Sequence, residues 1–166
     1  MRNYILHIIV VVLITSCSNS KQQKDDYTKA LNYCVNQATK TVNSLTDSSR
    51  VPRSIANGKK EWNLVDRRDW TSGFWPGIEW YLYEYTKDEK WKQRAEQSQR
   101  ILAPLIDSSA IDHDIGFVIY SSYGNGYRIT NDADYKTILL RAADTLARLY
   151  NPKVGTMPTT IISKRC

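Results

Sequence analysis

The chain has 166 residues, a formal net charge of +6, and an aromatic set of 5 Trp, 11 Tyr and 2 Phe. This length suits one ordinary domain and excludes a multidomain enzyme. An apolar content of 42% with 24% charged residues excludes the disordered and collagen-like classes. Basic and acidic residues are interleaved, so we expect no nucleic-acid partner, whereas the positive charge favours small anionic substrates.

The first residues have the pattern of a secretion signal. Arg2 precedes an apolar run from Ile5 to Ile14. This run is too short to cross a bilayer as a helix, because crossing takes about 20 residues. We therefore expect a signal peptide rather than a transmembrane anchor.

The signal ends in Ile14-Thr15-Ser16-Cys17, which resembles the lipobox of bacterial lipoproteins. The resemblance implies that residues 1–16 are removed and that Cys17 carries a lipid, with residues 17–25 as a polar tether. The protein would then be attached to a membrane in the bacterial periplasm or at the outer membrane. The alternative is an ordinary secretory signal that ends at a cysteine by chance.

The other two cysteines, Cys34 and Cys166, are far apart, and no Cys-x-x-Cys or other metal-ligand spacing occurs. We therefore expect no metal, no cofactor and no disulfide framework. Cys34 falls among the apolar positions of a helical pattern, where we expect it to be buried.

Apolar residues at spacings of three and four predict an all-α chain. Asp88 and Asp132 are suited to cap the starts of two helices, and Pro104 and Pro152 lie near helix ends. We expect no β-strand, and we expect residues 46–69 to form a loop. The expected helices cover residues 26–45, about 73–86, 88–105, 115–123 (closed by Gly124-Asn125-Gly126) and 132–149.

Two of the expected helices begin alike. The segments Asp88-Glu89-Lys90-Trp91-Lys92 and Asp132-Ala133-Asp134-Tyr135-Lys136 start 44 residues apart, and each is followed by an Arg-Ala pair. This spacing holds two helices and two loops, so it predicts repeated helical hairpins. Such hairpins bury their apolar faces only against neighbouring hairpins.

The densest signal runs from Asp66 to Trp80, where three Trp and one Phe stand among Gly and Pro residues. One helical face cannot accommodate all these rings, so we expect at least one at the mouth of the helix. An exposed indole can cover the apolar face of a sugar ring. We assign this role to Trp70 and, as a lesser candidate, to Trp75. The residues expected in the core are Phe74, Ile78 and either Trp80 or Tyr81.

A second group is Asp112-His113-Asp114-Ile115-Gly116-Phe117. Acidic residues at a helix start are commonly caps, which suits Asp112. Asp114 is followed at once by apolar residues, and a carboxyl group in an apolar pocket can donate a proton near neutral pH. His113 stands beside it, where it would position an anionic substrate or tune that proton.

In chain order, the segments Asp69–Gly77, Tyr83–Glu89 and His113–Phe117 resemble glycoside hydrolase family 88, the unsaturated glucuronyl hydrolases. The resemblance implies an (α/α)₆ barrel, of which residues 26–155 would form the first two to three helical hairpins. It also implies substrates that polysaccharide lyases release, namely oligosaccharides with a 4,5-unsaturated uronate. The related unsaturated rhamnogalacturonyl hydrolases are an alternative.

The resemblance assigns roles to individual residues. Asp114 matches one of two essential aspartates, His113 a substrate-contacting histidine, and Trp70 the tryptophan that packs on the unsaturated ring. Trp75 is a lesser candidate for substrate binding. The implied chemistry is hydration of a vinyl ether, which opens the sugar ring and releases the neighbouring sugar.

The sequence departs from the family downstream. The family's second aspartate lies in an Asp-x-x-x-Asn segment that this sequence does not contain, and residues 156–166 do not resemble the family. We therefore expect an N-terminal fragment that is inactive or nearly so. The alternative is a non-catalytic lipoprotein that binds saccharides or other proteins.

Overall fold

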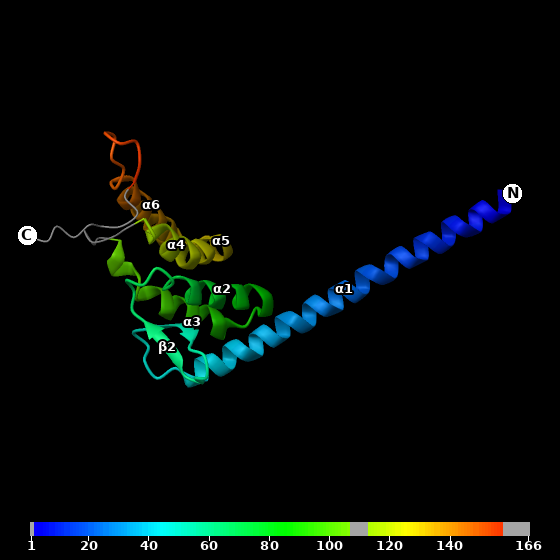
Figure 1. Cartoon of the computed structure of the whole chain (residues 1–166), viewed down its shortest axis with the longest axis horizontal. Coiled ribbons are helices and arrows are strands. Elements are labelled where there is room, and N and C mark those ends of the chain that lie inside the picture. The colour runs from blue at the N-terminus through cyan, green and yellow to red at the C-terminus, as the bar shows by residue number, and fades with distance from the viewer. Residues whose placement is uncertain (1, 107–112, 158–166) are drawn as a thin grey trace, which may run out of the picture. The chain divides into compact units, whose positions relative to one another are not determined.

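The computed structural model describes residues 2–106 and 113–157, with side chains from residue 22 onward (Figure 1). The side chain of Cys17 and residues 158–166 of the expected tail lie outside the described part. The chain divides into two compact units, Met1–Thr46 and Asp47–Cys166. Among the described residues, no helix combines the length and the apolar character needed to cross a membrane.

The first unit is the helix α1 (Arg2–Ser44), which runs through the segment 17–25 that was expected as a tether. Polar side chains form hydrogen bonds along this helix. Gln22 donates to Asp26 at 3.1 Å, and Gln23 donates to the Tyr27 hydroxyl at 3.0 Å. Contacts between side chains four residues apart stabilise a solvated helix. The expectation that Cys34 is buried is wrong, because this stretch of the helix faces solvent and the thiol is exposed.

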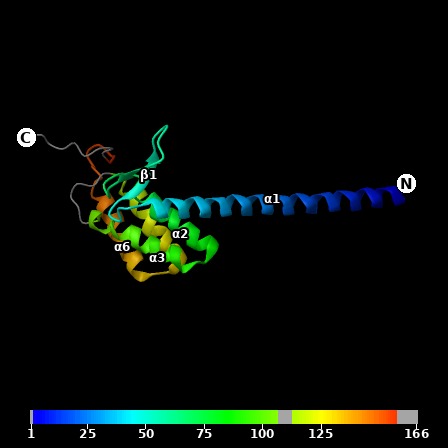
Figure 2. The same ribbon diagram turned by 90° about the horizontal axis from the view of Figure 1, so that it is seen from below.

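The second unit begins with a β-hairpin, so the expectations of no strand and of a loop over 46–69 are wrong here. β1 (Val51–Ile55) pairs antiparallel with β2 (Trp62–Val65). The connection contains Asn57-Gly58, and Gly58 has a φ of +74°, which glycine adopts without strain. Figure 2 shows the tip of the hairpin extending beyond the helices.

The first helical hairpin consists of α2 (Phe74–Thr86) and α3 (Glu89–Arg100), which lie side by side in Figure 1. Lys87 makes the turn in the left-handed conformation, with a φ of 57°. The carboxylate of Asp88 then accepts a hydrogen bond from the backbone N–H of Lys90 and caps α3, as predicted. A short 3₁₀ helix, η1 (Ala103–Leu105), follows at the position of Pro104.

The second helical hairpin repeats this turn. Asn131 has a φ of 58°, and the Asp132 carboxylate accepts hydrogen bonds from the backbone N–H groups of Asp134 and Tyr135 at the start of α6 (Ala133–Ala147). In both turns a threonine two residues before the aspartate bonds back into the preceding helix, Thr86 to Leu82 and Thr130 to Gly126. The predicted 44-residue repeat of helical hairpins is confirmed.

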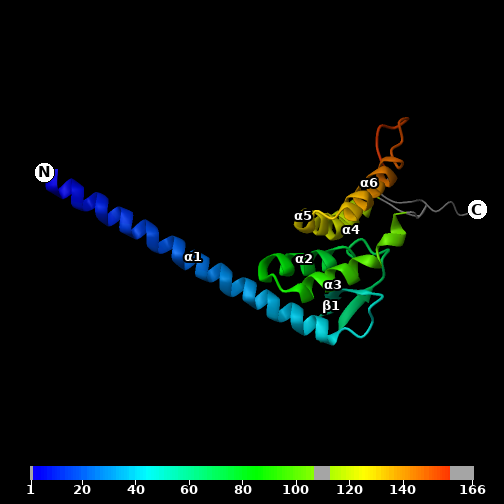
Figure 3. The ribbon, with the colours of Figure 1, turned by 180° about the vertical axis from the view of Figure 1, so that it is seen from behind.

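The first arm of this second hairpin is longer than expected. It comprises α4 (Ile115–Ile119), a π-helical turn η2 (Tyr120–Gly124) and α5 (Asn125–Thr130), and Figure 3 shows α4 and α5 in line above α2. The expected helix end at Gly124-Asn125-Gly126 is wrong. A Cβ at Gly126 would lie 3.0 Å from the ring of Trp80, so the small residue serves close packing rather than termination.

The core lies where α4 and η2 pack against α6 and the end of the first hairpin. Aliphatic residues dominate it, and burial of their apolar surface is the main stabilising contribution. Its buried members are Leu102, Leu105, Ile106, Ile115, Val118, Ile119, Tyr123 and Ala142.

Gly73, directly before α2, and Gly77, within it, bring the helical hairpins into backbone contact. A Cβ at Gly73 would lie 2.0 Å from the carbonyl oxygen of Val118, and a Cβ at Gly77 would lie 2.5 Å from that of Ser121. Neither distance leaves room for a methyl group, and the obstructing atoms are backbone. The two glycines therefore set the separation of α2 from α4 and η2.

We predict that Gly73→Ala destabilises the second unit by about 3 kcal/mol, because the methyl group must push the α4 backbone away. The measurement is the urea midpoint of the full chain followed by helical circular dichroism. Gly116→Ala is the matched control, since a Cβ there meets only Leu146 Cδ2 at 3.9 Å. Its expected effect is below about 1 kcal/mol, and equal effects of the two substitutions would contradict the close-approach argument.

Candidate functional site

Trp70 lies on the loop between β2 and α2, which successive turns hold in place. The backbone N–H of Asp69 bonds to the carbonyl of Asp66 at 3.2 Å, and that of Ser72 bonds to the carbonyl of Asp69 at 2.9 Å. The buried Ser72 hydroxyl donates to the carbonyl of Arg67 at 3.0 Å. The loop is therefore internally bonded on both sides of Trp70.

The indole of Trp70 stands edge-to-face with two phenylalanines. Its ring centroid lies 5.7 Å from that of Phe74 on α2 and 6.5 Å from that of Phe117 on α4. Edge-to-face contacts of this kind orient a ring without enclosing it, and Trp70 remains 46% exposed. As the sequence indicated, this tryptophan lies at the mouth of the helix with free surface for a ligand.

Asp114 lies at the start of α4, the helix that carries Phe117 and so contacts Trp70. It occupies the position before the first helical residue, and Phe117 follows three residues later, so both lie along one side of the first turn. Unlike Asp88 and Asp132, Asp114 makes no capping hydrogen bond with its side chain. Instead Asp114 Oδ1 lies 3.2 Å from Nε2 of His113.

His113 is partly buried and its two nitrogens differ in surroundings. Nε2 faces Asp114, whereas Nδ1 is buried with no hydrogen-bond partner among the described residues. Trp70, His113 and Asp114, three residues predicted from the sequence, are thus joined through the Trp70–Phe117 contact and the short His113–Asp114 distance.

Trp75, the other predicted sugar contact, lies in the core. It is 7% exposed, its ring packs at 6.5 Å from that of Trp62 on β2, and its N–H donates to Glu79 Oε1 at 3.0 Å. The ring joins the β-hairpin to α2. Of the two candidate tryptophans, only Trp70 offers an exposed face.

Two residues expected in the core, Phe74 and Ile78, are 37% and 44% exposed instead. Of the alternatives Trp80 and Tyr81, Trp80 is fully buried and donates its N–H to Gln99 at 2.8 Å, whereas Tyr81 is 55% exposed. Phe74, Ile78 and Tyr81 lie three and four residues apart on α2, so they form one apolar stripe that begins beside Trp70. The periodicity identified this face correctly, but no described residue covers it enough to bury it.

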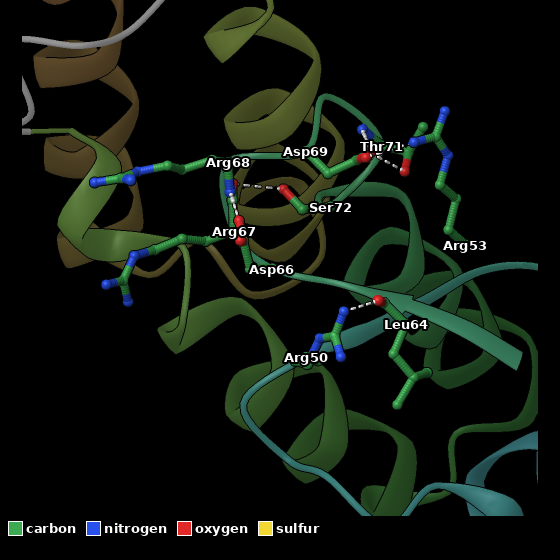
Figure 4. Close-up of polar contacts among 9 residues, drawn as sticks. All are labelled: Arg50, Arg53, Leu64, Asp66, Arg67, Arg68, Asp69, Thr71 and Ser72. Atoms are coloured by element: carbon green, nitrogen blue, oxygen red, sulfur yellow. Dashed lines mark hydrogen bonds and ion pairs between the residues drawn. The ribbon is translucent and has the colours of Figure 1, made fainter.

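Arg53 is a site residue that the sequence reasoning missed. Its Nη1 lies 2.5 Å from Asp69 Oδ2 (Figure 4). Its guanidinium carbon lies 6.0 Å from the centroid of the Trp70 ring. Asp69 Oδ1 in turn accepts hydrogen bonds from the Thr71 hydroxyl and backbone at 2.6 and 2.9 Å. Burial opposes ionisation of Asp69, but its contacts with Thr71 and Arg53 outweigh this and lower its pKa.

No group of three or more metal-ligating side chains occurs among the described residues. A cavity of about 370 Å³ lies between the end of α3 and the start of α6, and none of the predicted site residues contributes to it. Its walls are Glu96, Gln99, Arg100, Tyr123, Asp132, Asp134, Tyr135 and Ile138.

Comparison with known proteins points to one group of enzymes. An unsaturated glucuronyl hydrolase of Formosa agariphila is 30% identical over 136 residues, which are 81% of this chain and 34% of the relative. One of Bacillus sp. strain GL1 is 33% identical over 103 residues, or 61% of this chain and 27% of the relative. The homologues of this chain are unsaturated glucuronyl hydrolases. No protein-family model matches the sequence.

The solved structures agree. The crystal structure of an unsaturated glucuronyl hydrolase specific for heparin superposes with a TM-score of 0.71 at 34% identity, over 80% of this chain and 35% of that one. The predicted fold, a part of the six-hairpin (α/α)₆ barrel, is confirmed, and the homologues of this chain are glycoside hydrolases. The chain spans about a third of the length of the curated relatives it matches.

Beside Trp75, the buried carboxyl group of Glu79 makes stability depend on pH. Burial raises its pKa above the usual 4.5, although Ser98, Arg94 and Trp75 act in the opposite direction. A raised pKa in the folded state means that the folded chain binds this proton more readily than the unfolded chain. The contribution is therefore fully present below the unfolded pKa and is lost as pH rises through the folded value.

We predict that Glu79→Gln removes this dependence, so the wild-type chain loses stability relative to the variant as pH rises above the usual carboxyl pKa of 4.5. Urea midpoints at several pH values measure the difference. Glu84→Gln is the control with opposite sign, because hydrogen bonds from Arg128 lower the pKa of Glu84. If the difference in urea midpoint between the wild-type chain and Glu79→Gln does not change with pH, Glu79 does not titrate over the pH range tested.

Proposed function

We propose that this chain supplies the Trp70, His113 and Asp114 part of an active site that hydrolyses oligosaccharides ending in a 4,5-unsaturated uronate. The observation that carries the proposal is that an exposed indole packs against the first turn of α4, which begins at a carboxyl group that does not cap the helix. The indole would bind the flat unsaturated ring through its apolar face. The carboxyl group would serve the proton transfer.

The chemistry follows from the double bond between C4 and C5, which is a vinyl ether. Protonation at C4 leaves an oxocarbenium-like centre at C5, and water adds there with loss of its own proton. The resulting hemiketal opens and releases the neighbouring sugar. Asp114 is placed to carry a proton or to stabilise the positive centre, and His113 Nε2, 3.2 Å from it, is placed to hold its orientation.

The relatives support this substrate class. A variant of the Streptococcus agalactiae enzyme, 29% identical with a TM-score of 0.60, was crystallised with dGlcA-GalNAc6S. Because the chain matches only about a third of its relatives, we infer that the second carboxyl group comes from outside the matched region. The 166 residues alone would then bind such a disaccharide but turn it over slowly or not at all.

The test uses a chimera in which the matched 136 residues of the Formosa agariphila relative are replaced by those of this chain. We predict that it consumes unsaturated disaccharide, seen as loss of the ultraviolet absorbance of the conjugated ene-acid. Asp114→Asn should lower kcat by about 10² to 10⁴, because the proton step loses its carboxyl group. Trp70→Ala should mainly raise KM.

Tyr150→Ala is the control, because it removes an exposed aromatic ring beyond the end of α6. It should leave both constants unchanged. An active chimera whose turnover survives Asp114→Asn would refute the proposed role of Asp114. Binding by the 166-residue chain that is equally strong for saturated and unsaturated sugars, without turnover in the chimera, would favour a saccharide-binding protein.

We also propose that Cys17 is the lipidated N-terminus of the processed chain, which places the protein at a bacterial membrane. Intact-mass analysis after expression in a bacterium that processes lipoproteins should show loss of residues 1–16 and a diacylglyceryl addition. Cys17→Ser should abolish the addition, whereas Cys34→Ser, another change within α1, should not. An unmodified Cys17 in the membrane-free fraction would contradict the anchor.

A further inference from the structure

Arg53 stands at an irregularity of the β-hairpin. Pro52 pairs with Leu64 and Ser54 pairs with Asn63, so Arg53 is the extra residue of a β-bulge. A bulge interrupts the ladder and redirects a side chain, and bulges are common beside active sites. Here the redirected side chain points to the Asp69–Thr71 loop (Figure 4).

The guanidinium of Arg53 is held in one place. Asp69 binds its Nη1 at 2.5 Å, and Asp69 is itself fixed by the two hydrogen bonds from Thr71. The Trp70 ring bounds the guanidinium on another side, with 6.0 Å between its carbon and the ring centroid. Such prior ordering lowers the entropy cost of binding a ligand.

Arg53 also keeps hydrogen-bonding capacity that Arg128 uses within the fold. Both Nη atoms of Arg128 bond to Glu84. Among the described residues, Arg53 donates through Nη1 to Asp69, and its side chain is 38% exposed. A planar guanidinium with further N–H groups is suited to bind a carboxylate or a sulfate.

We infer that Arg53 binds an anionic group, a carboxylate or a sulfate, on the saccharide that stacks against Trp70, and that it selects anionic over neutral sugars. The inference rests on the proposed function for the role of Trp70. The Trp70 indole then makes the apolar contact with the saccharide, and Arg53 of the β-hairpin makes the charged contact. Arg53 is then a specificity-determining residue supplied by a strand.

The test is an NMR titration of the full chain that follows the indole N–H resonance of Trp70, assigned from Trp70→Phe. The probes are dGlcA-GalNAc6S, the same disaccharide without sulfate, and the neutral N-acetyllactosamine. Arg53→Gln should raise Kd about tenfold for the anionic probe that it contacts and leave Kd for the neutral probe unchanged. If Arg53→Gln weakens binding of both anionic probes, the carboxylate is the group that Arg53 contacts. If it weakens binding of the sulfated probe alone, the sulfate is that group.

Arg68→Gln is the matched control, because it removes the same charge from an exposed position two residues before Trp70. Figure 4 shows Arg67 and Arg68 extending from the side of the loop away from Arg53. The control should change Kd less than about twofold. Arg53→Lys keeps the charge but loses the planar fork, and it should give an intermediate Kd while preserving the hairpin.

Equal loss of affinity for neutral and anionic probes in Arg53→Gln would overturn the inference, since Arg53 would then only hold Trp70 in place. An effect no larger than that of Arg68→Gln would overturn it as well. If the wild-type chain binds none of the probes, or if Trp70 does not respond to them, the proposed function itself fails. In that case the inference fails with it.

Discussion

The close approach of α2 to α4 and η2 is the constraint on which the site depends. At Gly73 and Gly77 the backbones are in direct contact, with no space for a Cβ. Only at this separation does Trp70, which precedes α2, reach Phe117 on α4. Because Asp114 lies one helical turn before Phe117, the same two glycines determine how far the indole stands from the carboxyl group.

The helical hairpins were predictable because their signals are local. An aspartate cap, a preceding left-handed residue and apolar spacing all lie within one turn, and they occur twice, at Asp88 and at Asp132. The ion pair between Glu84 and Arg128 joins the two hairpins at positions that are themselves 44 residues apart. This ion pair therefore joins equivalent positions of the two repeats.

The β-hairpin was missed although it carried a local signal. Asn57-Gly58 between two apolar segments is typical of a hairpin turn. The strands are short, however, and Arg53 interrupts their alternation at the bulge, so no period of two is visible. Phe74 and Ile78 were misassigned to the core for another reason: periodicity shows which residues share a face, but not whether anything covers that face.

The candidate site was predictable only in part, and the difference has a physical cause. Trp70, His113 and Asp114 lie in short motifs whose order along the chain resembles that of a known family, so they could be named from the sequence. Trp75 has the same composition signal as Trp70, but only burial against Trp62 distinguishes them. Arg53 has no motif at all, and it joins the site because a bulge directs it to Asp69.

Stability does not explain that bulge. A half-exposed ion pair such as Arg53–Asp69 contributes about 1 kcal/mol or less, and the bulge interrupts hydrogen bonds of the ladder. Asp69 Oδ1 already accepts two hydrogen bonds from Thr71, so Arg53 is not the only group that favours its ionised form. An arrangement that costs regular strand pairing and contributes little to folding is best explained by what it places beside Trp70: a fixed positive charge with donors that a bound anion can use.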